Sequence, residues 1–317
     1  MKTKILVILL VSFIEISFSQ ETIYAESELD IPTQTETIYG TLLTPNSIEK
    51  PPLIIIIPGS GPTDRNGNNV MMKNNGVKYF AESLANHKIA TYRFDKSVLK
   101  FTKNDSLKIK ALTFKTFINE AKSVIKYFKK SEKYSKIIVA GHSQGSLVGM
   151  VSSENNKNVS AFISLEGAGR PIDEILIEQI NKQAPFLKDE TVRVLDSLKI
   201  GKRVADFNPM LISLFNQQVQ PFLISWLQYN PQNEIEKLTI PILIIQGTKD
   251  IQVVGTDAKL LLEANSKSQF VLIENMNHIF KEIKGEVNEN MQSYSNPNLP
   301  VMPELVSKIA GFINDLK

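Results

Sequence analysis

Ser143 lies in the motif Gly-His-Ser-Gln-Gly at residues 141–145, between an apolar run at 137–140 and a second apolar segment at 146–150. A strand that leads through Gly-x-Ser-x-Gly into a helix is the context of a nucleophile elbow. The turn is so tight that a side chain at either glycine would collide with the strand or the helix. We therefore predict that the Ser143 hydroxyl is exposed at the turn, near the positive N-terminal end of the helix.

Three histidines are present, and one of them is placed to activate Ser143. A serine hydroxyl is a poor nucleophile unless an adjacent base accepts its proton, and an acid must orient that base. His87 ends a predicted helix with no glycine or acid context, and the sharp turn should aim the His142 side chain away from the Ser143 hydroxyl. His278 follows the last predicted strand, and sites in open α/β sheets lie beyond the carboxyl ends of the strands. His278 is therefore the predicted base.

The acid of such a site lies between the serine and the histidine in chain order. Asp250 follows the apolar run at 242–245 through a short turn, so it should lie at the same edge of the sheet as His278. Asp257 is the alternative, but its position near the start of a predicted helix suggests capping or exposure to solvent. Singly, Asp250 and His278 could be an ordinary turn aspartate and surface histidine. Jointly they complete a predicted triad of Ser143, Asp250 and His278.

Two backbone amides are predicted to form the oxyanion hole. One belongs to Gln144, the residue after the nucleophile, and the other to a loop after an early strand. Pro-Gly-Ser-Gly-Pro at 58–62 occupies that place, and the Ser60 amide is the candidate donor. Loss of one such donor typically lowers turnover by about 10²–10³. Ser60→Ala keeps the amide and should have little effect by itself.

Strand and helix patterns alternate along most of the chain. Continuous β-branched runs such as residues 52–57 are typical of strands buried on both faces of a parallel sheet. Further strands are predicted at 89–94, 137–140, 159–165, 240–245 and 270–273, with helical apolar stripes at 77–84, 117–128 and 305–313. This order predicts an α/β fold with a mostly parallel central sheet and helices on both faces.

Between residues 167 and 237 the sequence carries only helical stripes. Sheet periodicity resumes at 240–245, so this block is predicted to be a helical cap inserted before the penultimate strand. With 317 residues, 42% of them hydrophobic, the chain can bury a substantial core. One catalytic domain at 21–317, with the cap as its insertion, is the predicted organisation.

Composition excludes several classes of function. The formal net charge is +3, from 36 basic and 33 acidic residues spread along the chain, so nothing indicates a nucleic-acid partner. Cysteine is absent, which excludes disulfides, a cysteine nucleophile and thiolate metal sites.

Residues 1–20 are predicted to be a signal peptide. Lys2 and Lys4 precede an apolar run at 5–14, and small residues follow at 17–20. The run is shorter than the roughly 20 residues that span a bilayer, although an uncleaved anchor is an alternative. Export of a cysteine-free chain is typical of a bacterial periplasmic or secreted enzyme, with no stable membrane span after cleavage.

With these residues in place, the chain resembles α/β-hydrolases. The segment Pro-Gly-Ser-Gly-Pro-Thr-Asp-Arg-Asn-Gly-Asn at 58–68 is similar to that of bacterial capped carboxylesterases, in the branch related to monoacylglycerol-lipase-like and prolyl-aminopeptidase-like hydrolases. Gly-Ala-Gly-Arg-Pro at 167–171 and Gly-Thr-Lys-Asp at 247–250 also fit that branch. The resemblance implies the α/β-hydrolase fold, the same triad and oxyanion amides, and no metal or organic cofactor.

One loop departs from this resemblance. Relatives carry Asp-Lys-Arg-Gly after the strand at 89–94, whereas this chain has Asp-Lys-Ser-Val at 95–98. The contribution of the loop to the rim of the pocket therefore stays open. Asp64, Arg65 and Asp95 are expected to form ion pairs that hold the oxyanion loop.

The predicted activity is hydrolysis of small-molecule carboxylic esters with short to medium acyl groups, through an acyl-serine intermediate. Phe215, Phe222 and Trp226 of the cap are candidates for an apolar substrate pocket, or they belong to the cap's own core. Arg170 could contact an anionic group of the substrate, but we expect it to form an ion pair with the cap.

Other functions are compatible with the same triad. A peptidase would hold a substrate amine with an acidic cluster, for which Asp173, Glu174 and Glu178 are candidates, equally well explained as a solvated helix face. A thioesterase is a further alternative, with export arguing against intracellular acyl-CoA. From a different class, the fold could serve a non-catalytic binding protein, but such relatives usually lose a triad member. The oligomeric state is not predicted.

Overall fold

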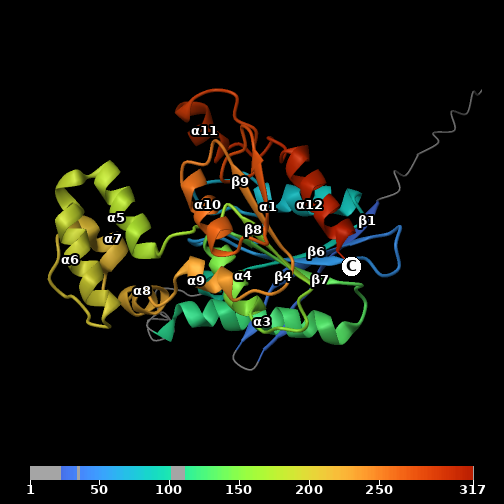
Figure 1. The fold of residues 1–317 in the computed structure, drawn as a ribbon, viewed down its shortest axis with the longest axis horizontal. Coiled ribbons are helices and arrows are strands. Elements are labelled where there is room, and N and C mark those ends of the chain that lie inside the picture. The colour runs from blue at the N-terminus through green and yellow to red at the C-terminus, as the bar shows by residue number, and fades with distance from the viewer. Residues whose placement is uncertain (1–22, 34–35, 101–110, 317) are drawn as a thin grey trace, which may run out of the picture.

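The computed structural model describes residues 23–33, 36–100 and 111–316, so the predicted signal peptide lies outside the described residues. Within these ranges, eight strands form one sheet in the order β1-β4-β6-β5-β7-β8-β9-β10 (Figure 1). The strands are β1 (Tyr24–Glu28), β4 (Gly40–Pro45), β5 (Leu53–Ile57), β6 (Ala90–Phe94), β7 (Ile137–His142), β8 (Ala161–Leu165), β9 (Ile242–Gly247) and β10 (Gln269–Ile273), beside a small hairpin of β2 (Ile31–Pro32) and β3 (Thr37–Ile38). Pairing from β6 to β10 is parallel, and β4 pairs antiparallel with both β1 and β6. The predicted mostly parallel sheet is therefore confirmed.

The isoleucine run of β5 explains why the centre of the sheet is buried on both sides. Ile54 and Ile56 belong to one hydrophobic cluster, and Ile55 and Ile57 belong to another. Because side chains alternate along a strand, these two clusters lie on opposite faces of the sheet. A sheet covered on both faces requires continuous apolar strands, which is the pattern found in the sequence.

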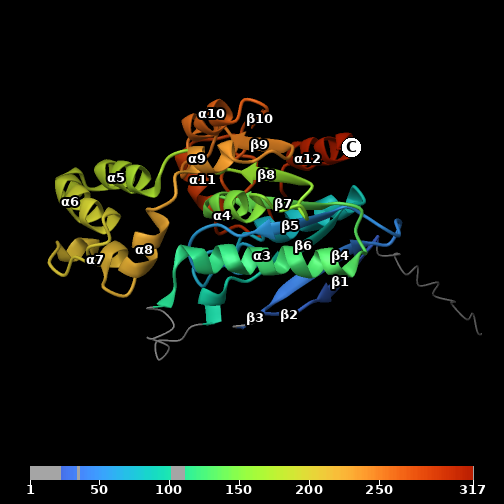
Figure 2. The same cartoon turned by 60° about the horizontal axis from the view of Figure 1, so that its bottom comes forward.

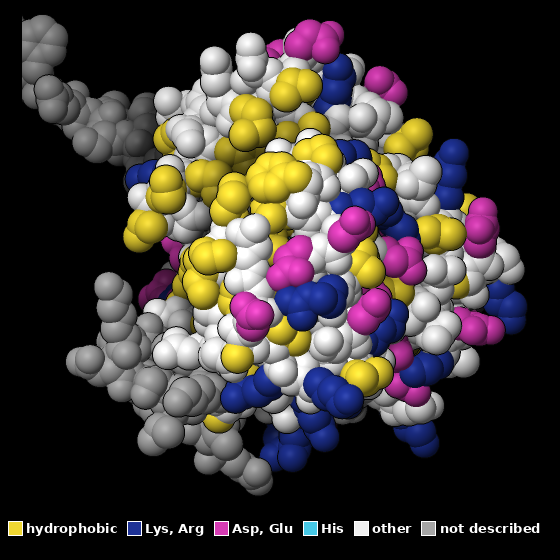
Figure 3. Space-filling view, turned by 90° about the vertical axis from the view of Figure 1, so that its left-hand side faces the viewer, with side chains coloured by type: hydrophobic (Ala, Val, Ile, Leu, Met, Phe, Trp, Pro, Cys, Tyr) yellow, Lys and Arg dark blue, Asp and Glu magenta, His cyan; other side chains and the backbone are white. Residues whose placement is uncertain are grey.

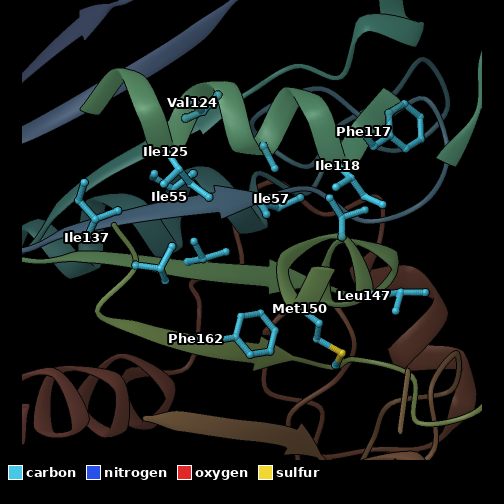
Figure 4. Packing of buried hydrophobic residues seen from close by; sticks show 14 of the residues in the cluster. Ile55, Ile57, Phe117, Ile118, Val124, Ile125, Ile137, Leu147, Met150 and Phe162 are labelled. Carbon is cyan, nitrogen blue, oxygen red and sulfur yellow. The ribbon is translucent and has the colours of Figure 1, made fainter. Parts of the chain in front are cut away.

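Helices cover both faces. One face packs against α3 (Phe114–Ser131), α4 (Gln144–Ser153), α9 (Pro231–Glu236) and α10 (Gly255–Ala264), and the other against α1 (Gly76–Asn86) and α12 (Pro303–Asp315); the short α11 (Val287–Ser293) follows the last strand. Figure 2 shows α3 running along one side of the sheet, and Figure 4 shows its residues Ile118 and Ile125 directed toward β5. No helix in the described part of the chain is long and apolar enough to cross a membrane.

A separate helical lobe, the cap, lies between β8 and β9 and stands beside the main domain (Figures 1 and 2). It comprises α5 (Ile172–Gln183), α6 (Lys188–Lys199), α7 (Ile212–Phe215) and α8 (Gln220–Trp226), with 3-10 turns at Pro185–Leu187 and Pro209–Leu211. The cap has its own hydrophobic cluster, built around buried residues such as Val194, Leu198 and Phe215.

The cap ends earlier than the sequence suggests. The predicted block reached residue 237, but Ile235 of α9 and the following Leu238 belong to the core of the main domain. Helical periodicity reports that a segment is helical and does not report which core its apolar face joins. The position of the insertion, before the penultimate strand, is as predicted.

Candidate active site

Ser143 occupies the turn between β7 and α4 with a backbone φ of 53° and ψ of −121°. A Cβ atom on Gly141 would lie 2.2 Å from the carbonyl oxygen of Gly145, and one on Gly145 would lie 2.3 Å from the carbonyl oxygen of Ile57. The requirement for two glycines is therefore a direct consequence of the close approach of strand and helix. A positive φ at serine costs about 1–3 kcal/mol, and the packing around the turn maintains it.

Asp250 and His278 are hydrogen-bonded to each other at the carboxyl edge of the sheet. His278 Nδ1 lies 2.7 Å from Asp250 Oδ2, and only 3% of His278 and 8% of Asp250 is exposed. The other carboxylate oxygen, Oδ1, accepts hydrogen bonds from the amides of Gln252 and Val253 at 2.7 and 3.0 Å. Burial by itself raises the pKa of Asp250, but the charge and hydrogen bond of His278 outweigh it and leave the pKa below its ordinary value. Asp250 is thus a fixed anion that orients the imidazole.

His142 braces the loop that carries His278. Its Nε2 donates to the carbonyl oxygen of His278 at 2.8 Å, and the two ring centroids lie 4.7 Å apart. Burial, and then the neighbouring His278, lower the pKa of His142 to about 3, so its imidazole is neutral. The sequence prediction treated His142 only as a residue that turns away from the serine and missed this contact.

Within the described residues, no hydrogen bond joins the Ser143 hydroxyl to His278. Serine–histidine contacts of this kind are often long without substrate and tighten when it binds. The brace from His142, the residue next to Ser143, keeps the serine turn and the histidine loop together.

The predicted oxyanion loop at 58–68 passes directly beside Ser143, the predicted nucleophile. A Cβ atom on Gly59 would lie 3.2 Å from Ser143 Cβ, so only glycine allows this approach without displacement. The Ser60 amide has no acceptor within the described part of the chain. Gln144 is the first residue of α4, and the first amides of a helix lack intrahelical partners. Both predicted amides are thus available beside Ser143.

Glu166, which was not predicted as a site residue, lies fully buried next to Asp250. It directly follows β8, and the amide of Gly247 donates to both of its carboxyl oxygens at 2.9 and 3.1 Å. Burial, and then the Asp250 carboxylate, raise the pKa of Glu166 well above its ordinary value, which favours the protonated carboxyl. The signal available in the sequence was an acid immediately after a buried strand, at the same sheet edge as the triad.

Ion pairs hold the oxyanion loop, in part as predicted. Arg65 donates to Asp95 Oδ2 through Nε at 3.0 Å and Nη2 at 2.8 Å, and Asp95 Oδ1 accepts from the Arg65 amide at 2.7 Å. Asp64 is not part of that ion pair. Its carboxylate accepts from the amides of Asn66 and Asn68 at 2.9 and 2.8 Å and shapes the turn.

The predicted ion pair of Arg170 with the cap is present, and its second partner is Asp257 of α10. Arg170 pairs with Glu178 of the cap and donates to Asp257 through Nε at 3.0 Å and Nη2 at 2.8 Å. Asp257 lies in the first turn of α10 as expected, but it is fully buried, so the expectation that it faces solvent was wrong. A guanidinium and two backbone amides, those of Gly169 and Arg170, neutralise it instead.

The three cap aromatics have different surroundings. Phe215 is completely buried in the cap's own cluster and offers no surface to a substrate. Trp226 is half-buried and stacks on Phe114 of α3, with centroids 5.5 Å apart and planes at 7°, while Phe222 contacts Phe117 at 5.5 Å. These two aromatics therefore join the cap to α3. The end of the molecule formed by the cap also shows a gathering of hydrophobic side chains at its surface (Figure 3).

No protein-family model matches this chain. Esterase EstD from Thermotoga maritima is 24% identical over 261 residues, covering 78% of this chain and 58% of that protein. The chain thus spans less than two thirds of the length of this curated relative.

Solved structures share the whole architecture. Est1E from Butyrivibrio proteoclasticus has a TM-score of 0.58 at 17% identity, covering 91% of this chain and 99% of its own. Pyrococcus furiosus esterase Pf2001 has a TM-score of 0.58 at 15% identity, covering 92% of both chains. The α/β hydrolase GrgF from Penicillium has a TM-score of 0.55 at 15% identity, covering 85% of this chain and 98% of its own. The chain therefore has the α/β-hydrolase fold.

Proposed function

We propose that this protein is a serine hydrolase that cleaves carboxylic esters through an acyl-serine intermediate. The observation that carries the proposal is the strained turn that exposes Ser143 beside the buried Asp250–His278 pair. A serine held at positive φ between a strand and a helix needs packing to maintain it, and such strain concentrates at functional sites. The names of EstD and Pf2001 as esterases support the same class of reaction.

The reaction proceeds in two steps. His278 Nε2 accepts the Ser143 proton, Ser143 Oγ attacks the ester carbonyl carbon, and the Asp250 carboxylate stabilises the imidazolium. The amides of Ser60 and Gln144 stabilise the oxyanion that develops on the carbonyl oxygen. His278 then protonates the departing alkoxide. In the second step His278 accepts a proton from the water that attacks the acyl carbon, and it returns that proton to Ser143 Oγ as the bond to the acyl group breaks and the acid is released.

Ester hydrolysis is favoured over peptidase activity by the state of the cap acids. Two of the three candidate acids are paired, Asp173 with Lys199 at 2.6 Å and Glu178 with both Arg170 and Lys182, while the third, Glu174, is exposed on α5. Acids whose charge is already neutralised are poor partners for a substrate amine. Short to medium acyl groups are the proposed substrates, with Phe222 and Trp226 as the cap residues closest to such a role.

Export is part of the same proposal. The basic, apolar and small residues in succession at 1–20 support cleavage near residue 20 and a periplasmic or secreted enzyme. Intact mass spectrometry of the protein recovered from a bacterial host should give a chain lacking this segment. Recovery of the full-length chain in the cytoplasm would contradict export.

A fluorophosphonate probe tests the assignment of the nucleophile. The wild type should be labelled, and p-nitrophenyl esters of two to eight acyl carbons should be hydrolysed faster than aminoacyl p-nitroanilides. Ser143→Ala should abolish both labelling and hydrolysis, while Ser146→Ala, in the neighbouring helix, should remain reactive. Normal ester hydrolysis by Ser143→Ala would refute the proposal.

A further inference from the structure

Lys96 is a buried lysine whose ammonium group contacts the oxyanion loop. It follows β6 by two residues, only 3% of it is exposed, and its Nζ donates to the carbonyl oxygen of Gly59 at 2.5 Å. A buried ammonium is costly unless its partners stabilise the charge. The mechanism described above makes no use of this cation.

The carbonyl that Lys96 contacts and the Ser60 amide belong to one peptide unit. The Gly59 C=O and the Ser60 N–H lie in one plane on opposite sides of the C–N bond, because that bond has partial double-bond character. A cation held at the oxygen therefore fixes the direction of the N–H. It also draws electron density toward the oxygen, which strengthens the N–H as a hydrogen-bond donor.

We infer that Lys96 is a positioning residue for the oxyanion hole, which orients and polarises the Gly59–Ser60 peptide toward the substrate's developing oxyanion. This inference rests on the proposed ester hydrolysis. Lys96 does not touch the substrate, and it acts through the Ser60 amide.

The loop at the end of β6 holds the oxyanion loop at two points. Asp95 binds the Arg65 guanidinium and amide, and the next residue, Lys96, binds the Gly59 carbonyl. The attachment at Gly59 precedes Ser60 in the chain, and the attachment at Arg65 follows it. The Asp-Lys pair thus defines the path of the loop.

The charged groups around Lys96 come from two elements. Glu120 of α3 is a buried carboxyl whose pKa is raised to about 7 by burial, and above that pH its charge favours the ammonium; His142 of β7 is neutral. The Phe117 ring, also from α3, lies 5.1 Å from Nζ and adds a cation–π contact. Burial lowers the pKa of Lys96 to about 8, while Glu120 acts in the opposite direction. Lys96 is therefore charged at neutral pH and loses its charge as the pH rises through about 8.

A donor aimed at the oxyanion contributes mainly in the transition state, so its loss lowers kcat more than it raises KM. Loss of a whole oxyanion donor costs about 10²–10³ in kcat, and loss of its polarising partner should cost less, about 10- to 100-fold. Above pH about 8 the wild type should lose kcat as Lys96 deprotonates. Lys96→Met should lack this alkaline decrease.

Lys281 offers a matched control in the same chain. It is also fully buried, donates to a backbone carbonyl, that of Leu299, and lies 4.8 Å from the Tyr79 ring centroid. Burial lowers its pKa to about 8 as well. Lys281 belongs to the turn that carries His278 and hydrogen-bonds Asn277 through its backbone, which Lys281→Met retains. The variant thus removes an equivalent buried cation whose ammonium contacts Leu299 and not the oxyanion loop.

The experiment compares Lys96→Met with Lys281→Met on p-nitrophenyl butyrate and on an alkyl trifluoromethyl ketone, whose adduct with serine carries an oxyanion. Lys96→Met should lower kcat about 10- to 100-fold, change KM less than about threefold and weaken ketone inhibition in proportion to kcat/KM. Lys281→Met should stay within about twofold of the wild type in all three quantities.

Equal losses in the two variants, or an alkaline decrease in kcat that persists in Lys96→Met, would overturn the inference. If Lys96→Met does not fold, Lys96→Gln replaces it, because the glutamine amide keeps a hydrogen-bond donor for the Gly59 carbonyl but does not titrate. An alkaline decrease in kcat that persists in Lys96→Gln would likewise overturn the inference. Ester hydrolysis that survives Ser143→Ala would refute the proposed function itself. Activity that depends on Ser143 and is insensitive to Lys96 would refute this inference alone.

Discussion

Glu166 and Asp250 lie side by side at the carboxyl ends of the paired strands β8 and β9, and both carboxyl groups are buried. Two adjacent carboxylates cannot both ionise readily in a buried site. The pKa of Glu166 is raised, by burial and then by Asp250, whereas His278 keeps the pKa of Asp250 lowered. The protonated Glu166 can donate to Asp250, which remains the anion that faces His278.

Glu166→Gln should gain stability relative to the wild type as the pH rises. The unfolded chain ionises Glu166 near its ordinary pKa of about 4.3, whereas the folded chain keeps the proton to higher pH. The contribution of Glu166 to the free energy of unfolding is therefore full below about pH 4.3. It is lost as the pH rises toward the folded pKa, by up to about 1.4 kcal/mol per pH unit. Glutamine has no such loss. Urea unfolding of both proteins between about pH 4 and 8 measures the difference, and a pH-independent difference would contradict a protonated Glu166.

Asp250→Asn should lower kcat by about 10³- to 10⁴-fold, because an amide can no longer fix the tautomer of His278 or stabilise its charge. Asp257→Asn is the matched control, since it changes a second buried aspartate in the same segment of the chain. It should lower the free energy of unfolding and leave kcat within about threefold. Steady-state ester hydrolysis distinguishes the two variants. A larger loss of kcat in Asp257→Asn than in Asp250→Asn would show that Asp250 is not the acid of the triad.

Arg170→Met should destabilise the fold by about 3–5 kcal/mol, because it leaves the Asp257 carboxylate buried without its guanidinium. Arg170→Met combined with Asp257→Asn should recover part of that loss. Chemical denaturation of the four proteins completes a double-mutant cycle. If the two single changes simply add, the ion pair does not tie the cap to α10.

Phe215→Ala and Trp226→Ala should differ in the property they change. Phe215 fills the cap core, so its truncation should lower the free energy of unfolding by about 3–5 kcal/mol with little change in acyl preference. Trp226 joins the cap to α3, so its truncation should change the ratio of kcat/KM between butyrate and octanoate esters. The p-nitrophenyl ester series measures that ratio. An unchanged ratio in Trp226→Ala would show that Trp226 packs the cap against α3 and has no part in acyl preference.

The sheet, the glycine-flanked serine turn and the order of the site loops followed from the sequence. Each depends on local signals: the β-branched runs at 53–57 and 242–245, the two glycines around Ser143, and the strand-end positions of Asp250 and His278. Strand order places these loops at one edge without any knowledge of side-chain contacts.

Residues whose roles depend on tertiary neighbours were not predictable in the same way. Lys96 and Glu166 acquire their surroundings from segments more than thirty positions away, the Gly59 carbonyl and the Gly247 amide. Asp257 does lie at the start of a helix, but the guanidinium that covers it comes from the distant cap connection. No periodicity in the sequence reports such partners.

The cap cluster shares no fully buried residue with either core of the main domain. Substitutions that reshape the cap interior therefore leave the packing around Ser143 and Asp250 undisturbed. The lobe is joined to the main domain through the Arg170–Asp257 pair at one end and the Trp226–Phe114 stack at the other. If the protein hydrolyses esters as proposed, its substrate range can change through this lobe while Ser143, Asp250 and His278 stay in place.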